Sequence, residues 1–310
     1  DVPDGWVYEN NGIGAGSNND ILQAGDAVFA EAQWIYNPTG WSRSRVNIRW
    51  PSGTWAHSHG NEIHLPLKTT GAWDHVTVQH EEAHCVMWAL YGHWPPGSGP
   101  SPHYIYSESS YGFAITEGWA EFMMCAVDNN PDNWVDWYSG HGGNMETNDW
   151  YNCIDTGDLD GAIIEGSIAS ILWDINDPVN IPGDNDHMAW GFDEIFTVMR
   201  YDQPDTIYQF WDDWKTRWPT VSTSVGPLCD IYWNYGIDED YLPWGQPWGG
   251  TISINAGAKY TTSRTVTLTL FCDDWGSGVR YMRFSENMGA WGSWYYYATS
   301  FSFTLTSAGE

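Results

Sequence analysis

The segment His80-Glu81-Glu82-Ala83-His84 carries two histidines four residues apart, inside a stretch whose pattern predicts a helix over residues 74–91. Four residues of helix turn the second histidine about 40° around the axis and advance it roughly 6 Å, so both imidazoles can bind one small cation. The glutamate after the first histidine projects to the flank, where it would meet a water molecule rather than the ion. The segment therefore predicts a metal site, although two unrelated histidines on a polar helix face would give the same letters.

A second motif lies in residues 115–122, whose sequence is Ile-Thr-Glu-Gly-Trp-Ala-Glu-Phe. Its first glutamate, Glu117, is separated from His84 by 32 residues, 85 to 116. A catalytic zinc takes three protein ligands and leaves one position for water. Two histidines from one helix and a carboxylate from the next would complete such a ligand set. The ordinary alternative is a pair of exposed carboxylates four residues apart.

The two motifs together resemble those of the gluzincin metallopeptidases, in which the H-E-x-x-H helix is followed by a helix with the pattern N-E-G-x-A or N-E-x-x-x-D. The matching run here is Thr-Glu-Gly-Trp-Ala-Glu at 116–121, with Thr116 where the family usually has asparagine. The resemblance implies a zincin-like domain with one catalytic Zn²⁺ bound by His80, His84 and Glu117.

The resemblance also implies roles for the residues around the zinc. Glu121, one turn after Glu117, would orient a ligand histidine. Glu81 would be the general base. Glu82 lies about 100° further around the helix, and we expect its replacement by glutamine to be nearly harmless.

Stabilisation of the developing oxyanion needs a donor that neither motif contains. Gluzincins supply a tyrosine or a histidine from elsewhere in the chain. Tyr111 and His187 are the candidates here, with His141 as a third. The sequence does not choose among them, and each is equally compatible with a structural role.

Two other zinc-hydrolase patterns fit less well. The metzincin motif requires glycine three residues after the second histidine and a third histidine three residues later, but Met87 and Leu90 occupy those positions. His57-Ser58-His59 has the spacing of a further motif but lacks the Asp-His that should follow. We expect His57 and His59 to face solvent from a strand.

Composition favours an extracellular protein. The 310 residues include 40 acidic and 11 basic side chains, which gives a net charge of −29. So acidic a surface repels nucleic acid and anionic membranes, and we expect no nucleic-acid partner. Five cysteines are too few for a disulfide-built scaffold. The 23 tryptophans are compatible with a core, with a substrate cleft near Trp88 and Trp119, or with carbohydrate binding.

The sequence begins at Asp1 without a basic or apolar leader, and we expect that a secretion signal has been removed. No run of about 18 apolar residues is present, so we expect no membrane span. These features predict a secreted protein, and the gluzincin resemblance implies protein or peptide substrates. Extracellular glycoproteins and cell-surface material are among the partners that this location would offer.

Patterning predicts an α+β fold for residues 1–245, with a small N-terminal sheet followed by a helical part. The predicted helices are 21–35, 74–91, 117–127, 160–175, 191–200 and 206–218. The predicted strands are 45–50 and 62–66. In gluzincins a strand shortly before the metal helix forms the edge of the cleft, and we expect 62–66 to be that strand.

A different pattern begins near residue 245. The Gly- and Pro-rich segment 244–250 predicts a linker, and alternation predicts strands at 251–255, 265–271, 279–284 and 301–306. Residues 254–260, 266–270 and 278–285 resemble the bacterial Ig-like domains appended to secreted enzymes. Such sandwiches need about seven strands and about 100 residues. The resemblance therefore implies a partial Ig-like sandwich at 246–310, and we expect its last strands to be missing.

Calcium binding is left open at two places. Asp155, Asp158 and Asp160 before Gly161, and residues 184–186, partly match a calcium loop. Neither has the full alternation of oxygen ligands with a closing glutamate. Turn formation is the more ordinary explanation for both.

The sequence as a whole predicts a secreted zinc endopeptidase in which Glu81 activates a water molecule. The alternative from another class is a tryptophan-rich protein that binds carbohydrate or a surface and whose metal site is structural or vestigial. A structural zinc fills its fourth position with a protein ligand, so an open fourth position would favour the enzyme. A zinc hydrolase that acts on a non-peptide ester or amide shares every ligand and is a third interpretation.

Overall fold

The computed structural model describes residues 18–67, 74–132, 144–147, 161–177, 188, 190–220, 224–237, 248–258, 260–273, 281–282, 284 and 295–306. The chain divides into two compact units. The first comprises residues 1–219 and 230–237, and the second comprises residues 220–229 and 238–310. The division falls within helix α7 (Gly226–Asn234). Helices and small sheets occur together, so the predicted α+β class is confirmed.

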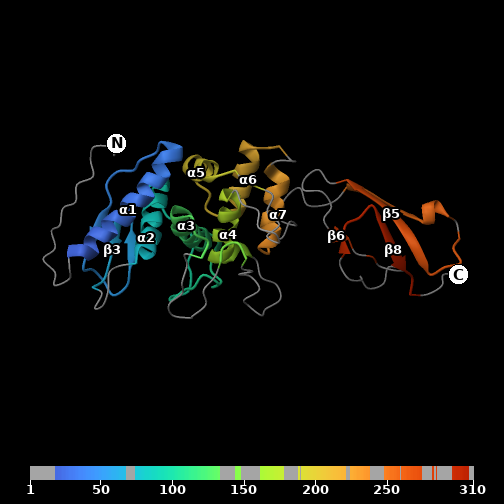
Figure 1. Ribbon diagram of the computed structural model, residues 1–310, viewed down its shortest axis with the longest axis horizontal. Coiled ribbons are helices and arrows are strands. Elements are labelled where there is room, and N and C mark those ends of the chain that lie inside the picture. The colour runs from blue at the N-terminus through green and yellow to red at the C-terminus, as the bar shows by residue number, and fades with distance from the viewer. Residues whose placement is uncertain are drawn as a thin grey trace. The chain divides into compact units, whose positions relative to one another are not determined.

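A small sheet and two helices form the N-terminal part of the first unit (Figure 1). Strand β3 (Glu62–His64) is central, with β1 (Asn47–Arg49) parallel on one side and β2 (His57–His59) antiparallel on the other. Helices α1 (Asn18–Thr39) and α2 (His75–Tyr91) pack together beside this sheet. The apolar core of this region consists of Ala24, Ala27, Val28, Ile63, Leu65, Val78 and Cys85.

The predicted strand 62–66 lies in the middle of this sheet, and its expected position at the edge of a cleft stays a prediction. The segment 62–66 contains the central strand β3, and β2 lies at the edge beside it. Gly60, with φ of +63°, makes the turn that folds β2 back onto β3. Alternation shows which residues a strand buries but not which neighbours it pairs with, so the central position of β3 in the sheet could not be predicted. His57 and His59 are exposed, as expected.

Helix α2 begins and ends at the predicted residues. The Asp74 carboxylate accepts a hydrogen bond from the Val76 backbone N–H at 3.3 Å and caps the first turn. Gly92 takes the left-handed conformation, with φ of +70°, and its N–H donates to the Trp88 carbonyl at 2.8 Å. Both signals are local, and they fix the length of the helix that carries the two histidines.

Helix α3 (Tyr111–Asp128) begins six residues before the predicted start at 117. The Ser110 hydroxyl caps it by accepting from the Phe113 N–H at 3.3 Å. Gly112 lies in the first turn of α3, where a Cβ atom would lie 2.3 Å from the Pro96 carbonyl oxygen. This glycine serves close packing of the preceding loop on the helix.

The rest of the first unit is helical. It contains η2 (Gly161–Ile163), α4 (Glu165–Asn176), α5 (Phe192–Tyr201) and α6 (Ile207–Arg217), close to the predicted segments, and part of α7, which was not predicted. Helix α3 packs on both α2 and α4 (Figure 1). The Trp119 indole N–H donates to the Ala83 carbonyl at 3.0 Å and fixes α3 against α2. No helix in the described ranges is long and apolar enough to cross a membrane.

The second unit contains antiparallel strands. One sheet has the order β4-β5-β8, from β4 (Trp248–Ile254), β5 (Thr265–Asp273) and β8 (Ser300–Thr304). The short strands β6 (Tyr281–Met282) and β7 (Tyr295–Tyr296) pair separately. Strand β4 begins at Trp248, so the predicted linker 244–250 is wrong in its last three residues. The Ig-like sandwich stays a prediction.

Candidate metal centre

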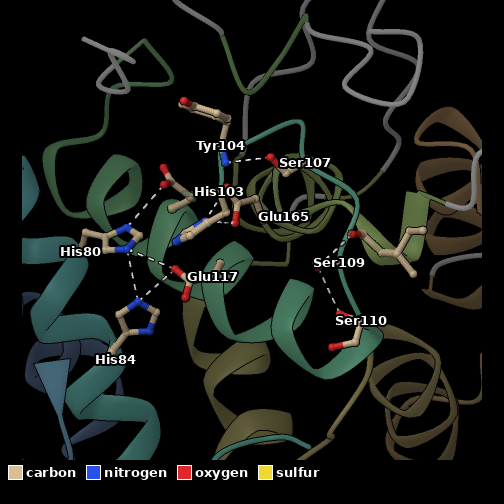
Figure 2. Close-up of polar contacts among 11 residues, drawn as sticks. His80, His84, His103, Tyr104, Ser107, Ser109, Ser110, Glu117 and Glu165 are labelled. Atoms are coloured by element: carbon tan, nitrogen blue, oxygen red, sulfur yellow. Dashed lines mark hydrogen bonds and ion pairs between the residues drawn. The ribbon is translucent and has the colours of Figure 1, made fainter. Parts of the chain in front are cut away.

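His80, His84 and Glu117 converge where α2 packs on α3 (Figure 2). The Nε2 atom of His84 lies 3.2 Å from both His80 Nε2 and Glu117 Oε2, and His80 Nε2 lies 3.4 Å from the same carboxylate oxygen. Donor atoms of a tetrahedral zinc lie about 3.3 Å apart, because each zinc–ligand bond is about 2.0 Å long. The three atoms therefore have the mutual spacing that one such ion requires.

The local sequence explains this convergence. His80 and His84 share one face of α2, and their rings meet edge to face with centroids 4.8 Å apart. The hydrogen bond from Trp119 to Ala83 holds α3 against α2 at the level of the first motif. Glu117, two residues before this tryptophan, is thereby brought to the imidazole nitrogens.

The electrostatics of the group favour a bound cation. Burial alone would raise the pKa of Glu117, but the adjacent His84 and His80 outweigh it and hold that pKa well below its usual range. Burial alone would lower the pKa of His80, but Glu117 and the charge of Glu121 outweigh burial and raise it. The Glu117 carboxylate and the two imidazoles thus stabilise positive charge between them. A metal ion and protons compete for the same donor atoms.

Glu121 lies behind the first histidine. Its Oε1 is 3.4 Å from His80 Nδ1, on the side of the ring away from Glu117. Burial raises the pKa of Glu121 to about 8, against the opposing charge of His80. A carboxylate in this place can fix the orientation of a ligand imidazole.

Glu81 is buried on the same helix, with 7% of its surface exposed. Burial raises the pKa of Glu81, and the charges of His80 and His84 oppose that rise. Within the described part of the chain, its carboxylate accepts no hydrogen bond. A carboxylate of raised basicity with no competing partner is suited to accept a proton from water.

The structure contradicts the expectation that Glu82 is dispensable. Glu82 is fully buried and forms an ion pair with Arg43, whose side chain is also almost wholly buried. Burial raises the pKa of Glu82 to about 7 even though Arg43 opposes the rise. The partner lies 39 residues away in the sequence, so helix geometry alone could not reveal it. Removal of one charge from a buried pair is strongly destabilising.

Tyr111 is the one predicted oxyanion donor that lies among the described residues, and the structure does not bring it to this group. Tyr111 opens α3, about 9 Å along the helix from Glu117, and its ring packs edge-on against Tyr208 with centroids 5.6 Å apart. His187 and His141 lie outside the described residues, as do the candidate calcium positions 155, 158, 160 and 184–186.

A second pair that sequence reasoning missed lies beside the first group. His103 Nδ1 is 3.0 Å from Glu165 Oε2, and both side chains have donor atoms within 4.8 Å of a Glu117 oxygen. One signal for Glu165 exists in the sequence, because it interrupts the apolar stripe of α4 between Ile164 and Ile168. His103 lies in the loop before α3 and carries no comparable signal.

The two tryptophans predicted near the cleft differ. Trp119 is completely buried between α2 and α3, so of the alternatives that the sequence left open it belongs to the core. Trp88 is partly exposed and packs on Trp94 with centroids 5.1 Å apart. The Trp94 ring meets His84 edge-on at 6.1 Å. The rings of Trp88 and Trp94 therefore lie beside the histidine group, towards the C-terminal end of α2.

Comparison with known proteins adds the family. A family model described as the mycolysin C-terminal domain matches residues 34–233, which is more than half of the chain. The chain belongs to the mycolysin C-terminal domain family. The mycolysin C-terminal domain is a domain of zinc metallopeptidases, and mycolysin-type peptidases are secreted zinc enzymes. Every described residue of the site lies within the mycolysin match. No curated protein matches the chain.

Proposed function

We propose that the chain is a secreted zinc endopeptidase that hydrolyses peptide bonds with Glu81 as general base. The observation that carries the proposal is the 3.2–3.4 Å spacing of the donor atoms of His80, His84 and Glu117. Membership of a metallopeptidase domain family supports it from an independent direction.

Each residue of the group has a role in the proposed reaction. His80, His84 and Glu117 would hold the zinc, and Glu121 would fix the His80 ring through its Nδ1 atom. When bound, the zinc would lower the pKa of a water molecule to about 7 and polarise the substrate carbonyl. Glu81 would take a proton from the attacking water and deliver it to the leaving amine, which contributes about 10²–10⁴-fold.

We also infer that two parts of the chain have different functions. Residues 1–245 would suffice for catalysis, and residues 246–310 would form an Ig-like module without a catalytic role. The helical composition of the first unit and the antiparallel strands of the second support this division. The net charge of −29 suits an extracellular protein whose substrates are proteins or peptides.

Some of the tryptophans that suggested a carbohydrate-binding protein belong to the core, whereas Trp55 is 74% exposed. Trp119, Trp211 and Trp214 are each at most 1% exposed, so these tryptophans build the core. A binding surface needs aromatic rings that a ligand can reach. A zinc hydrolase of non-peptide esters or amides would use the same group, and only substrate choice separates it from the peptidase.

The proposal is tested by metal removal and restoration on the whole chain. Chelation should abolish cleavage of an unbiased peptide library, and about one equivalent of zinc should restore it, with cuts at internal bonds. Hydrolysis of esters but of no peptide would favour the non-peptide hydrolase. Specific glycan binding without any hydrolysis would favour the binding protein.

A further inference from the structure

The loop between α2 and α3 is fixed to the start of α4. The Gly166 N–H donates to the Ile105 carbonyl at 2.8 Å. The backbone N–H and the hydroxyl of Ser109 both donate to the Ile163 carbonyl, at 2.9 and 3.0 Å. Ile105 itself is 1% exposed. These contacts fix the loop to α4 at Ile105 and at Ser109. The loop residues just before Ile105 are therefore held in a defined place.

His103 is the side chain that this loop presents to the metal group. Its ring stands edge-on to Phe113 with centroids 5.0 Å apart, and its Nδ1 lies 3.0 Å from Glu165 Oε2. Figure 2 shows the imidazole with Glu165 on one side and the side chains of His80 and Glu117 on the other. About a third of the His103 side chain is exposed, so a substrate can reach it.

The pairing with Glu165 determines the charge of the ring. Glu165 is 3% exposed, and His103 is its hydrogen-bond partner in the described structure. A buried carboxylate requires a paired cation. The hydrogen bond that His103 donates to Glu165 is the main cause that raises the pKa of His103 to about 9. A ring that is protonated on both nitrogens donates from Nδ1 to Glu165 and keeps a second N–H, on Nε2, for another acceptor.

A second metal site explains the pair less well. Donor atoms of one tetrahedral zinc lie about 3.3 Å apart, and the three atoms of the first group satisfy this spacing. His103, Glu117 and Glu165 are only within 4.8 Å of one another. Among the described residues, no ion pair joins His103 to Glu117. The geometry therefore fits a role for His103, held by Glu165, as a hydrogen-bond donor beside the proposed zinc ligands.

We propose that His103 hydrogen-bonds the carbonyl oxygen of the bond being cleaved and that Glu165 is its positioning residue. This inference rests on the proposed peptidase function. The Nε2–H of His103 would stabilise the negative charge that develops on this oxygen when water attacks the carbonyl carbon. The proton stays on His103, because Glu81 carries the water proton to the leaving amine. Loss of one such donor costs about 10²–10³-fold in kcat.

The test compares His103→Ala and Glu165→Gln with His93→Ala in the zinc-loaded chain. His93 also pairs with a carboxylate, Asp205, at 3.3 Å, but this pair is exposed at the far end of α2. Zinc content should be unchanged in all three variants. For His103→Ala, kcat should fall about 10²–10³-fold with little change in KM. Glu165→Gln should show a smaller fall in kcat.

Calorimetric binding of a phosphonate peptide, whose tetrahedral group carries the negative charge, gives a readout that does not depend on turnover. Its affinity should fall in His103→Ala by a factor similar to the fall in kcat, whereas the affinity of a cleaved product peptide should not change. Loss of zinc in His103→Ala would show that His103 is a ligand. Unchanged kcat and phosphonate affinity would show a structural role. Wild-type protein that neither cleaves peptides nor binds the phosphonate would overturn the peptidase proposal as well.

Discussion

The backbone of Gly118 lies so close to Glu165 that a Cβ atom on Gly118 would come within 2.7 Å of the Glu165 carbonyl oxygen. The same atom would lie 2.5 Å from the Cβ of Ile168. This close approach of α3 and α4 sets Glu165 beside Glu117. Gly118, the glycine of the second motif, therefore permits the close packing of α4 on α3.

Replacement of Gly118 by alanine should force α3 and α4 apart. Overpacking of a buried contact costs about 1–3 kcal/mol, so denaturant unfolding should show a loss of that size. Catalysis should fall more than zinc content does, because the displaced residue is Glu165 rather than a proposed ligand. Unchanged stability would show that the helices can separate freely at this point.

Replacements of Glu117 and Glu121 should weaken zinc binding to different degrees. Glu117→Ala removes a proposed ligand and should leave the chain without bound zinc after dialysis. Glu121→Gln removes only the partner of His80 and should lower zinc affinity about 10–100-fold. Competition with a chromogenic chelator measures both. Full zinc occupancy and activity in Glu117→Ala would show that the third ligand is misassigned, with Glu121 next in line.

Glu81→Gln should keep zinc and lose at least about 10²-fold in turnover, because glutamine keeps the shape but cannot accept the proton. The control is Glu108→Gln, since Glu108 is exposed and lies outside the metal helix. Glu82 cannot serve as the control because of its buried pair with Arg43. Equal losses in the two variants, or full activity in Glu81→Gln, would contradict the proposed base.

Glu31→Gln should stabilise the protein increasingly as pH rises. Burial, followed by the charge of Glu82, raises the pKa of Glu31 well above its ordinary 4.5. The folded state therefore keeps a proton that the unfolded state has lost, and stability falls as pH rises from about 4.5 towards the folded pKa. Within that window, the loss approaches about 1.4 kcal/mol per pH unit.

Glutamine at this position has no charge to bury, so it removes the loss. Chemical denaturation of the zinc-loaded wild type and variant at pH 5 and pH 8 measures the difference between their free energies of unfolding. The advantage of Glu31→Gln should be larger at pH 8. An equal or larger advantage at pH 5 would show that Glu31 titrates normally in the folded chain.

A chain that ends at Trp244 should remain folded and active on small peptides. It retains α7 and therefore the whole first unit. Cooperative unfolding, zinc content and peptide cleavage should match those of the full chain. Loss of zinc or of cooperative unfolding in the shorter chain would show that the remainder is integral to the catalytic part.

Local signals account for what the sequence predicted well. Asp74 and Gly92 mark both ends of α2 by side-chain capping and left-handed geometry, and each acts within one turn. The spacing of His80 and His84 follows from the helix itself. The predicted start of α3 lay at Glu117, because the cap at Ser110 that begins the helix earlier was not recognised.

Tertiary contacts account for what the sequence could not predict. Arg43 and Glu82 are 39 residues apart, and His103 and Glu165 are 62 residues apart. Neither pair follows from periodicity or capping, since each depends on how separate segments pack. Of these four residues, only Glu165 has a signal in the sequence, because it is a charged residue in an apolar stripe.

Anomalous X-ray scattering at the zinc absorption edge, from crystals of the zinc-loaded chain, would show whether zinc binds between α2 and α3. We predict one zinc peak about 2.0–2.2 Å from donor atoms of His80, His84 and Glu117, with its fourth position open to water. Absence of a peak between these three residues, or a fourth protein ligand that closes the site, would contradict this prediction.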